Sequence, residues 1–286
     1  MLTGRAHPSL LHSYSSERRA AAKGLVEFDH TWSRVVGARG QDAPTNLTNP
    51  LPRVAQAFVD NLPFTCGLTI QYEPSALVGP STHQALATGF DIGMRLHSAP
   101  VVRLADARPL QLGHVLEADA RFRLFVFAPA HDNGSVDPST QHSPRGAHGA
   151  ATSDIAQLCH WLAHDPASPM LRHRAPGEDL HSVIDTRVVF QQHPHALAFE
   201  RMPELLRPAV GRYGLCDYEK VLCASPSKDG DNTMDIFDLR GINRSTGCMV
   251  VVRPDQHVGH ILPIAARNEL AAYFAGILTV RNTAHA

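Results

Sequence analysis

The sequence predicts an α/β fold, and three observations in its second half support this class. A run of apolar and aromatic β-formers over 122–127 predicts a buried strand, and residues 183–190 read as a second strand. Between them, residues 154–163 carry apolar side chains at helical spacing. An amphipathic helix over 265–278 follows near the end of the chain. Strands that alternate with helices favour a layered α/β fold over an all-helical or all-β one.

The other elements predicted in the second half of the chain complete a known order of strands and helices. Residues 202–210 read as a short helix interrupted by prolines, and residues 220–224 as a strand candidate. Two strands, over 249–252 and 257–262, flank the turn at Pro254–Asp255. Strand, helix, strand, helix, three strands and a last helix is the order of a thioredoxin-like α/β fold. No two cysteines have the C-x-x-C spacing, which disfavours a disulfide oxidoreductase.

The apolar positions of the two clearest helices predict which side chains are buried. The expected buried positions are Ile155, Leu158, Cys159, Leu162, Leu270, Phe274, Ile277 and Leu278.

The first part of the chain is expected to be mainly helical. The spacing predicts one long helix over 8–36, capped by Ser9 and stopped by Gly37. On this helix, Tyr14 is expected to pack and Arg18 to pair with a carboxylate on a neighbouring element. The remaining expected elements are a helix over 46–61, a strand over 64–72, short strands over 101–104 and 111–116, and a loop insertion over 130–152.

Composition limits the classes of function. Lysine plus arginine number 26 and aspartate plus glutamate 27, so no basic excess indicates a nucleic-acid or membrane partner. The five cysteines are odd in number, which indicates a reducing cytoplasm rather than a disulfide scaffold. The first residues do not resemble a signal peptide, and no apolar run is long enough to span a bilayer.

Histidine is abundant, with 18 residues, but the spacing does not indicate a metal site. The pairs His193–His195 and His257–His260 do not fit HExxH or Cys/His ligand patterns. We therefore expect no bound metal and interpret the histidines as mostly surface and loop residues.

Two stretches resemble a known enzyme family. Residues 10–18 have the pattern LLxxYxxER, followed by Phe28, Asp29 and Trp32. This stretch resembles the long helix that closes the flavin domain of phenol 2-monooxygenases and 3-hydroxybenzoate 4-monooxygenases, which are class A FAD-dependent aromatic hydroxylases. Residues 64–77 also fit that family's pattern F-[ST]-x-G followed by Y-x-x-S-x-L.

The second stretch is more specific. It comprises residues 214–221, 235–244 and 250–263, and it resembles the C-terminal dimerisation domain of the same enzymes, which is similar to thioredoxin in fold. In that family the RPDQ turn is usually followed by tyrosine, whereas here it is followed by His257. The resemblance covers nearly the whole chain, and the 130–152 loop matches least.

The resemblance implies an intact enzyme that uses NADPH and FAD to hydroxylate a phenolic or hydroxybenzoate ring with O2. The G-x-G-x-x-G phosphate turn of its flavin half is not found here. We therefore expect a C-terminal portion that binds neither FAD nor NADPH alone and is not catalytic by itself. Residues 1–95 would be the remnant of the FAD and substrate domain, and residues 96–286 the thioredoxin-like dimerisation domain.

No catalytic or cofactor-binding residue transfers from the resemblance, but some residues are candidates for contacts. The candidates for an interdomain or dimer contact are Tyr218, Glu219, Asp238, Arg240 and Arg244, with a solvated loop network as the equal alternative. Tyr72 and Ser75 are candidates to face the active site in an intact enzyme. Turn chemistry alone accounts for Asp255 and Gln256.

The expected partners are a second copy of the chain, the missing flavin domain or a full-length paralogue. An alternative function is a stand-alone, non-catalytic dimerisation or interaction module. A flavin-encoding reading frame just upstream would favour the enzyme portion, and an isolated gene would favour the module.

Overall fold

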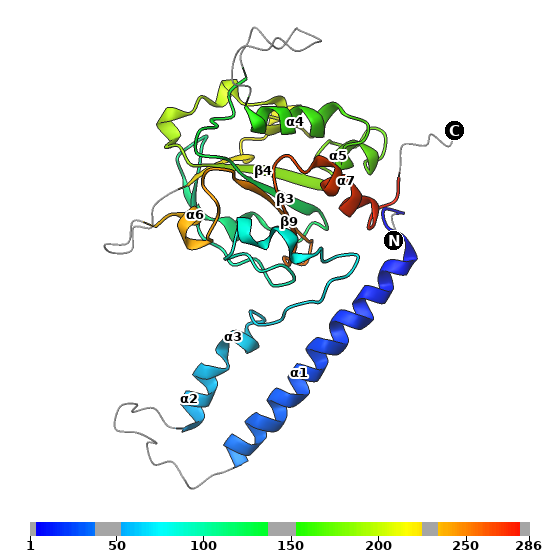
Figure 1. Cartoon of the computed structure of the whole chain (residues 1–286), viewed down its shortest axis with the longest axis vertical. Coiled ribbons are helices and arrows are strands. Elements are labelled where there is room, and N and C mark those ends of the chain that lie inside the picture. Colours follow the sequence, from blue (N-terminus) through cyan, green and yellow to red (C-terminus); the bar gives the residue numbers. More distant parts are fainter. Residues whose placement is uncertain (1–3, 38–52, 137–152, 225–233, 281–286) are drawn as a thin grey trace.

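The computed structural model describes residues 4–37, 53–136, 153–224 and 234–280. These residues form an α/β body and a helical arm that extends away from it (Figure 1). The body is built on a seven-stranded mixed sheet in the order β2-β1-β7-β4-β3-β8-β9. The prediction of an α/β fold is therefore confirmed.

Five strands from β7 to the β9 edge make up most of the sheet. They are β3 (Phe122–Phe127), β4 (Ile184–Phe190), β7 (Val221–Ala224), β8 (Cys248–Val252) and β9 (Val258–Leu262). β3 and β7 run parallel to β4, while β8 is antiparallel to β3 and β9 is antiparallel to β8. These strands are those predicted, to within a residue or two at each end.

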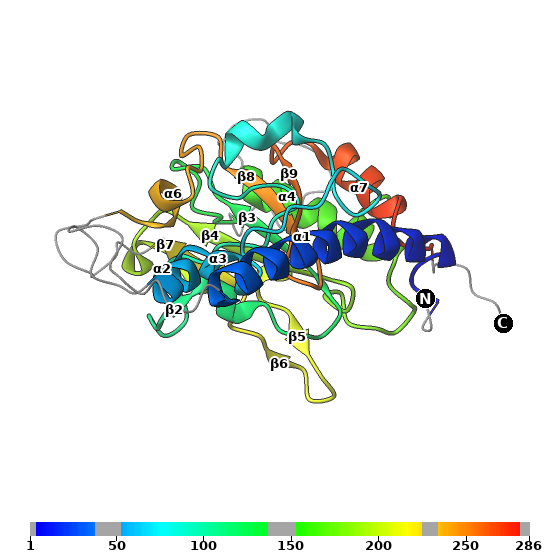
Figure 2. The same cartoon turned by 90° about the horizontal axis from the view of Figure 1, so that it is seen from below.

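Short strands and turns extend the sheet beyond β7. β1 (Pro100–Arg103) pairs antiparallel with both β7 and β2 (Pro109–Gln111). Proline cannot donate a hydrogen bond to a further strand, so Pro109 on the three-residue β2 blunts this edge. A separate hairpin of β5 (Ala209–Val210) and β6 (Leu215–Cys216) projects from the body (Figure 2).

Both faces of the sheet are covered. Along β3, Leu124 and Val126 belong to the apolar cluster on one face, whereas Phe125 and Phe127 belong to the cluster on the other. This alternation is the two-residue period of a strand. Because each face is covered, every residue of β3 is buried, and all but Arg123 are apolar.

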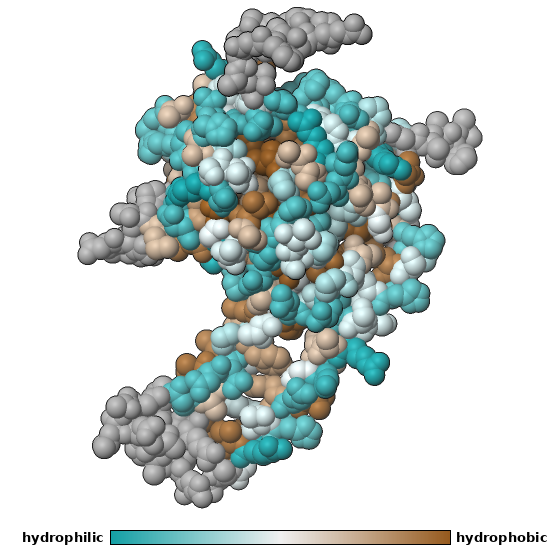
Figure 3. All heavy atoms as spheres, viewed as in Figure 1, coloured by the Kyte–Doolittle hydropathy of each residue, from teal (hydrophilic) through white to brown (hydrophobic). Residues whose placement is uncertain are grey.

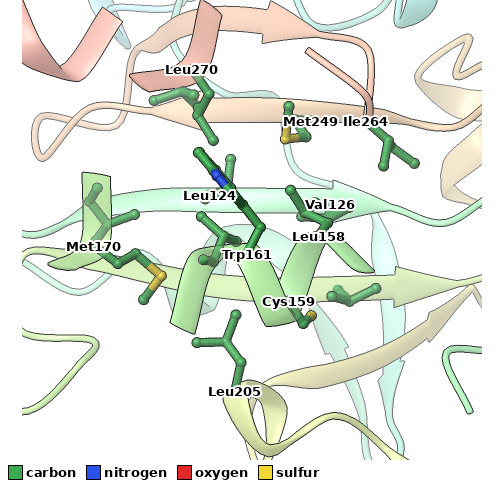
Figure 4. Packing of buried hydrophobic residues seen from close by; sticks show 14 of the residues in the cluster. Leu124, Val126, Leu158, Cys159, Trp161, Met170, Leu205, Met249, Ile264 and Leu270 are labelled. Carbon is green, nitrogen blue, oxygen red and sulfur yellow. The ribbon is translucent and has the colours of Figure 1, made fainter. Parts of the chain in front are cut away.

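Helices cover the first face. α4 (Asp154–His164) and α7 (Arg267–Ala275) pack there with the four-residue α5 (Pro169–Arg172) (Figure 4). All eight predicted helical core positions are buried, namely Ile155, Leu158, Cys159, Leu162, Leu270, Phe274, Ile277 and Leu278. Ser153 caps α4 by accepting a hydrogen bond from the Ala156 amide.

The second face is covered by mostly irregular chain. Residues 72–99, including the 3-10 helix η2 (Ser81–Leu86), pack there through Phe90, Ile92 and Leu96. The remaining cover is η3 (Leu112–Val115) and α6 (Ile236–Leu239).

Three predicted elements are wrong. The strand over 64–72 is replaced by α3 (Leu62–Thr65) and irregular chain, since no strand among the described residues lies beside it to complete a ladder. In place of a strand over 111–116, η3 buries Leu112 and Val115, which share one side of a 3-10 turn. The helix over 202–210 is only η6 (Glu204–Leu206) followed by β5, since Pro203 and Pro208 bound it.

The arm consists of η1 (Pro8–Leu10), α1 (Leu11–Gly37), α2 (Arg53–Asp60) and α3. The long predicted helix is thus confirmed, although His7, not Ser9, accepts the capping hydrogen bond. α1 contains no buried residue. The predicted residues 46–52 of the second helix, and residues 137–152 of the predicted loop insertion, lie outside the described residues.

An aromatic cluster holds α1 against α2 and α3. The Phe28 ring lies 6.1 Å from Trp32 and 5.1 Å from Phe64, and Trp32 lies 6.3 Å from Phe58, measured between ring centroids. Two short 3-10 helices, η4 (Pro194–Ala196) and η5 (Phe199–Arg201), complete the described elements of the body. None of the helices in the described part combines the length and apolarity that a membrane crossing needs.

Candidate functional site

The arm and the body meet at Arg253, the residue that directly follows β8. Its guanidinium donates hydrogen bonds to both carboxylate oxygens of Glu17 on α1, at 2.7 and 2.8 Å. It also donates to both oxygens of Asp255, at 3.1 and 2.7 Å. We call Glu17, Tyr72, Arg253, Asp255 and His257 the joint.

The joint is a shielded ionic contact. The side chains of Arg253 and Glu17 are only 5% and 10% exposed. The Tyr72 ring lies 5.2 Å from the Arg253 guanidinium and 4.6 Å from the His257 ring. Burial opposes the charge on Arg253, but Glu17 and Asp255 outweigh it and raise the pKa of Arg253. This contact therefore holds α1 to the body as a charged, two-pronged pair.

The expectation for Arg18 is wrong, and its neighbour Glu17 makes the ion pair instead. Arg18 lies over the ring of Tyr14 at 6.0 Å, and Tyr14 itself is 65% exposed rather than packed. Adjacent helix positions are turned by about 100°, so Glu17 and Arg18 cannot both face the body. The sequence pattern does not specify which of the two sides meets β8.

The turn that carries the joint forms as predicted, but turn chemistry alone does not account for Asp255 and Gln256. Gln256 has a positive φ of 71°, and its amide donates to the Arg253 carbonyl at 2.9 Å. Beyond turn chemistry, Asp255 contributes to the joint and Gln256 accepts a hydrogen bond from Arg95 at 2.6 Å.

A second ionic cluster lies inside the body, at the start of β3 and β4. Asp185 is fully buried, and its carboxylate contacts Arg123 and Arg187 at 3.1 Å each and Lys220 at 2.5 Å. We call these four residues the Asp185 network. Burial opposes ionisation of Asp185, but Arg187, Lys220 and Arg123 hold its pKa at about 2.

His181 lies beside the Asp185 network, with Nδ1 3.6 Å from the Asp185 carboxylate. Burial, helped by the charge on Lys220, lowers the pKa of His181 to about 4. His181 also lines a hollow of about 570 Å³ with Arg5, Arg121 and Lys220. Each of those three cations is paired with a carboxylate in the described part of the chain, so none is free to bind an anionic ligand.

The predicted contact residues do not form one network in the structure. Glu219 pairs with Arg103 at 2.5 Å and with Arg187 at 3.6 Å. Tyr218 is 52% exposed and stacks on Phe199, with 5.0 Å between the ring centroids.

The other three predicted contact residues lie at α6. Arg244 pairs with Asp238 at 2.8 Å and with Asp235, the N-cap of α6, at 2.7 Å. Arg240 donates to the Ser98 carbonyl at 2.6 Å. Among the described ion pairs, none joins this group to Glu219, so the predicted cluster is divided between two places.

The two residues expected to face an active site differ in environment. Tyr72 is only 5% exposed and packs inside the joint. Ser75 is exposed and lines a hollow of about 380 Å³ between the first turns of the arm and residues 276–277.

The residues present do not fit an FAD pyrophosphate at the junction between β3 and α4. At that helix N-terminus the buried Asp132 carboxylate accepts hydrogen bonds from the Ile155 amide and the Ser153 hydroxyl, at 3.0 and 2.6 Å. A carboxylate already occupies the position where helix amides would bind a phosphate, and it would repel one. Within the described ranges, no group of three or more His, Cys, Asp or Glu residues could hold a metal.

Sequence reasoning missed the Asp185 network, although a signal was present. Arg123, Asp185 and Arg187 interrupt otherwise apolar strands, and a charge in a strand buried on both faces requires a partner. The pattern indicates that partners exist but does not identify them.

Comparison with known proteins identifies the family. Residues 70–282 match the family model described as "Phenol hydroxylase, C-terminal dimerisation domain". The 3-hydroxybenzoate 4-monooxygenase of Comamonas testosteroni is 40% identical over 278 residues, which cover 97% of this chain and 40% of the relative. The FAD-dependent monooxygenase terD of Aspergillus terreus is 27% identical, covering 100% of this chain and 44% of its own length.

A third relative is the phenol 2-monooxygenase fsqG of Aspergillus fumigatus, 28% identical over 96% of this chain and 41% of that protein. The chain thus spans about two fifths of the length of these relatives. A solved structure of BsSco, a member of the Sco family of cytochrome c oxidase assembly proteins, aligns with 66% of this chain and 94% of its own at 10% identity. Its TM-score of 0.31 does not establish a common fold.

The match covers most of the body and begins before β1, and the same relatives also align with the arm. The chain therefore belongs to the family of phenol hydroxylase C-terminal dimerisation domains.

Proposed function

We propose that this chain is the C-terminal portion of a FAD-dependent, NADPH-using monooxygenase that hydroxylates a phenolic or hydroxybenzoate ring. The observation that carries the proposal is the family match over residues 70–282 together with relatives that are named as monooxygenases. In this proposal the body dimerises with a second copy, and the arm contacts the flavin-binding part.

The exposed apolar side chains of the arm support the second contact. Leu11, Tyr14 and Leu25 lie on one side of α1 and are 57%, 65% and 58% exposed. Further exposed apolar side chains on the arm are Val26, Phe58, Val59 and Leu62. Figure 3 shows apolar patches on this part of the surface. Apolar side chains exposed on one side of a helix are typical of a surface that contacts another protein.

We further propose that the body is thioredoxin-like. The parallel pair β3–β4 is joined through α4, and the antiparallel pair β8–β9 is followed by α7. This central arrangement of a βαβ unit followed by a ββα unit supports the proposal. The short strands β1 and β2 and the hairpin would be additions to it.

The division of the chain at residues 95 and 96 stays a prediction. The amides of Gly79 and Gly93 donate to β9 carbonyls at 2.8 Å each, and residues 72–99 cover one face of the sheet. These contacts, and the start of the family match at residue 70, favour a boundary nearer residue 70. The arm would then be the element shared with the flavin-binding part.

FAD and NADPH are proposed as cofactors of the intact enzyme only. Asp132 at the N-terminus of α4 supports the expectation that this chain alone binds neither nucleotide. We also propose that the protein works in the cytoplasm, because all five cysteines are free thiols.

The first test is the mass of the protein in its native cells, detected with an antibody against the C-terminal region. A mass well above 31.1 kDa, with phenol-dependent NADPH oxidation by the purified protein, would support the proposal. A mass of 31.1 kDa, in cells where no flavin-binding protein co-purifies with the chain, would contradict it and favour the stand-alone dimerisation module.

A second test uses the purified chain and free FAD. We expect no flavin absorbance to remain with the chain after gel filtration. Stoichiometric FAD binding by the 286-residue chain would overturn the expectation that the nucleotide site lies elsewhere.

A further inference from the structure

Two parts of the described surface each expose three or more large apolar side chains: the arm, and the β5–β6 hairpin with its base. The hairpin and its base expose Tyr213 by 74%, Leu215 by 67% and Tyr218 by 52%. The arm lies before residue 70, whereas the hairpin lies inside the range 70–282 that matches the dimerisation domain. Only the hairpin is therefore part of the module whose family description names dimerisation.

The pairing between β5 and β6 is too short to stabilise the hairpin by itself. Each of its strands has two residues, and Gly211 and Gly214 form the tip with positive φ angles of 68° and 60°. A two-stranded hairpin of this size is marginally stable in water. The hairpin projects from the body (Figure 2), and Tyr213 at its tip is 74% exposed.

The charges around the hairpin are complementary to one another. At the tip, Arg212 lies 4.8 Å from the Tyr213 ring and forms no ion pair with any described residue. At the base, Glu204 in η6 and Glu200 in η5 are exposed and likewise have no ion-pair partner in the described ranges. If two copies dock with their hairpins crossed about a two-fold axis, Arg212 at the tip of each hairpin would lie near Glu200 and Glu204 at the base of the other.

The residues at the base of the hairpin are already ordered in the single chain. Tyr218 is held in place by stacking on Phe199 at 5.0 Å, and the Asp217 amide extends the hairpin ladder by donating to Pro208 at 2.9 Å. Ordered tyrosines lose little conformational entropy on binding, and tyrosine and arginine are enriched at the centres of protein interfaces. Tyr213 and Tyr218, which are 74% and 52% exposed, supply part of the ~800 Å² per partner of a standard interface, and the rest of the hairpin and its base supplies the remainder.

We propose that the β5–β6 hairpin, through Arg212, Tyr213, Leu215 and Tyr218, is the surface on which a second copy of this chain docks in a two-fold contact. Arg212 of each copy pairs with Glu204 of the other. This inference rests on the proposed function, since it specifies the surface through which the body dimerises.

The test is sedimentation of the full chain over a concentration series, with Tyr213→Ala and Leu215→Asp as the disrupting variants. We expect a dimer for the unmodified chain and an increase in its dissociation constant of about tenfold or more for each variant. Leu25→Asp is the matched control, because Leu25 is 58% exposed but lies on the arm. It should leave the dimer unchanged, and circular dichroism should show the same fold for all variants.

A charge exchange makes the test specific for the pairing. Arg212→Glu should weaken the dimer by placing like charges together, and the double variant Arg212→Glu with Glu204→Arg should restore it at low salt. If Arg212→Glu weakened the dimer only by destabilising the fold, the second substitution would not restore the dimer.

The experiment distinguishes a failure of this inference from a failure of the proposed dimerisation. A dimer that survives the hairpin variants overturns this inference but leaves the proposed dimerisation standing. A dimer that Leu25→Asp dissociates instead assigns the contact to the arm and overturns the inference. A chain that is monomeric at every concentration overturns both the inference and the proposed dimerisation.

Discussion

α4 and α1 are both amphipathic helices, yet one is buried and the other is not. α4 has 11 residues and buries five of them against the sheet, whereas α1 has 27 residues and buries none. Both helices follow the same apolar periodicity in the sequence. The difference shows that periodicity predicts an apolar side of a helix but does not say whether this chain supplies the surface that covers it.

Ion pairs differ between the body and the arm in the same way. The Asp185 network is enclosed in the body, where removal of Asp185 leaves buried cations with only their more exposed second partners. The ion pair Lys23–Glu27 on α1 has side chains that are 79% and 68% exposed, and water screens it. We therefore expect the body to be cooperative and sensitive to substitution and the arm to tolerate substitution.

The largest expected effect is at Asp185. Asp185→Asn should lower the free energy of unfolding by about 3 kcal/mol, because Arg123, Arg187 and Lys220 would lose the one fully buried carboxylate that they share. Each cation would keep only a more exposed partner, namely Asp119, Glu219 and Asp217. Urea denaturation measures this loss. The matched control, Glu27→Gln on α1, should change the same quantity by about 0.5 kcal/mol or less. Similar losses for the two variants would refute the distinction between body and arm.

Two phenylalanine substitutions, one in the body and one in the arm, test the same comparison for apolar packing. Phe127 is fully buried and packs between Phe90 and Phe237, so Phe127→Ala should cost about 3–5 kcal/mol. Phe28 is half-buried in the aromatic cluster of the arm, and Phe28→Ala should cost about 1 kcal/mol or less in the main unfolding transition. Equal shifts of the urea midpoint would mean that the arm unfolds together with the body.

Acid should destabilise the body through His181. Its pKa in the folded chain is about 4, below the ~6.5 of an unfolded chain. Between these values the unfolded chain binds a proton that the folded chain does not, so stability falls as pH falls from about 6.5 to about 4. The loss is at most about 3 kcal/mol. Burial also lowers the pKa of His173 and His260, which act in the same direction.

The measurement is the free energy of unfolding in urea across that pH window for the parent chain and His181→Gln. Glutamine retains an N–H donor for the Leu205 carbonyl but cannot be protonated in this range. The variant should have a flatter pH dependence. The same slope in both proteins would exclude His181 as its source.

The smallest and most local effect is expected at the joint. Glu17→Gln removes the charge that holds α1 to Arg253, while Asp255 keeps the arginine paired. Hydrogen exchange of α1 amides should accelerate by an amount equivalent to about 1–2 kcal/mol, with exchange in β3 and β4 unchanged. Asp29→Asn, an exposed change on the same helix, is the control and should alter neither region. Faster exchange throughout the body would show that the joint stabilises the whole molecule.

The elements that the sequence predicted correctly have strong local signals. β3 and β4 consist mostly of β-formers, and α4 and α7 carry apolar residues on one side. The element over 64–72 has the composition of a strand but no neighbouring strand, and Phe64 instead packs on Phe28. Strand propensity reflects fit to a sheet, so composition misleads where the fold offers no place in one.

The candidate residues show the same limit. Density of charge along the chain suggested one cluster of Tyr218, Glu219, Asp238, Arg240 and Arg244, but the fold places them at β7 and at α6 with different partners. The ionic contacts of the joint and of the Asp185 network join residues up to 236 positions apart. Sequence proximity does not predict such partners.

The sequence by itself determined the α/β class, the main strands and helices, the buried sides of α4 and α7, and the family to which the chain belongs. These features depend on local periodicity and on motifs that are contiguous in the chain. Only the tertiary structure decided that Glu17 rather than Arg18 meets Arg253, that Asp185 collects three cations, and that Tyr213 projects from the body. These contacts depend on which elements the folded sheet brings together, and the energy of a buried charge or an exposed ring is set by that neighbourhood.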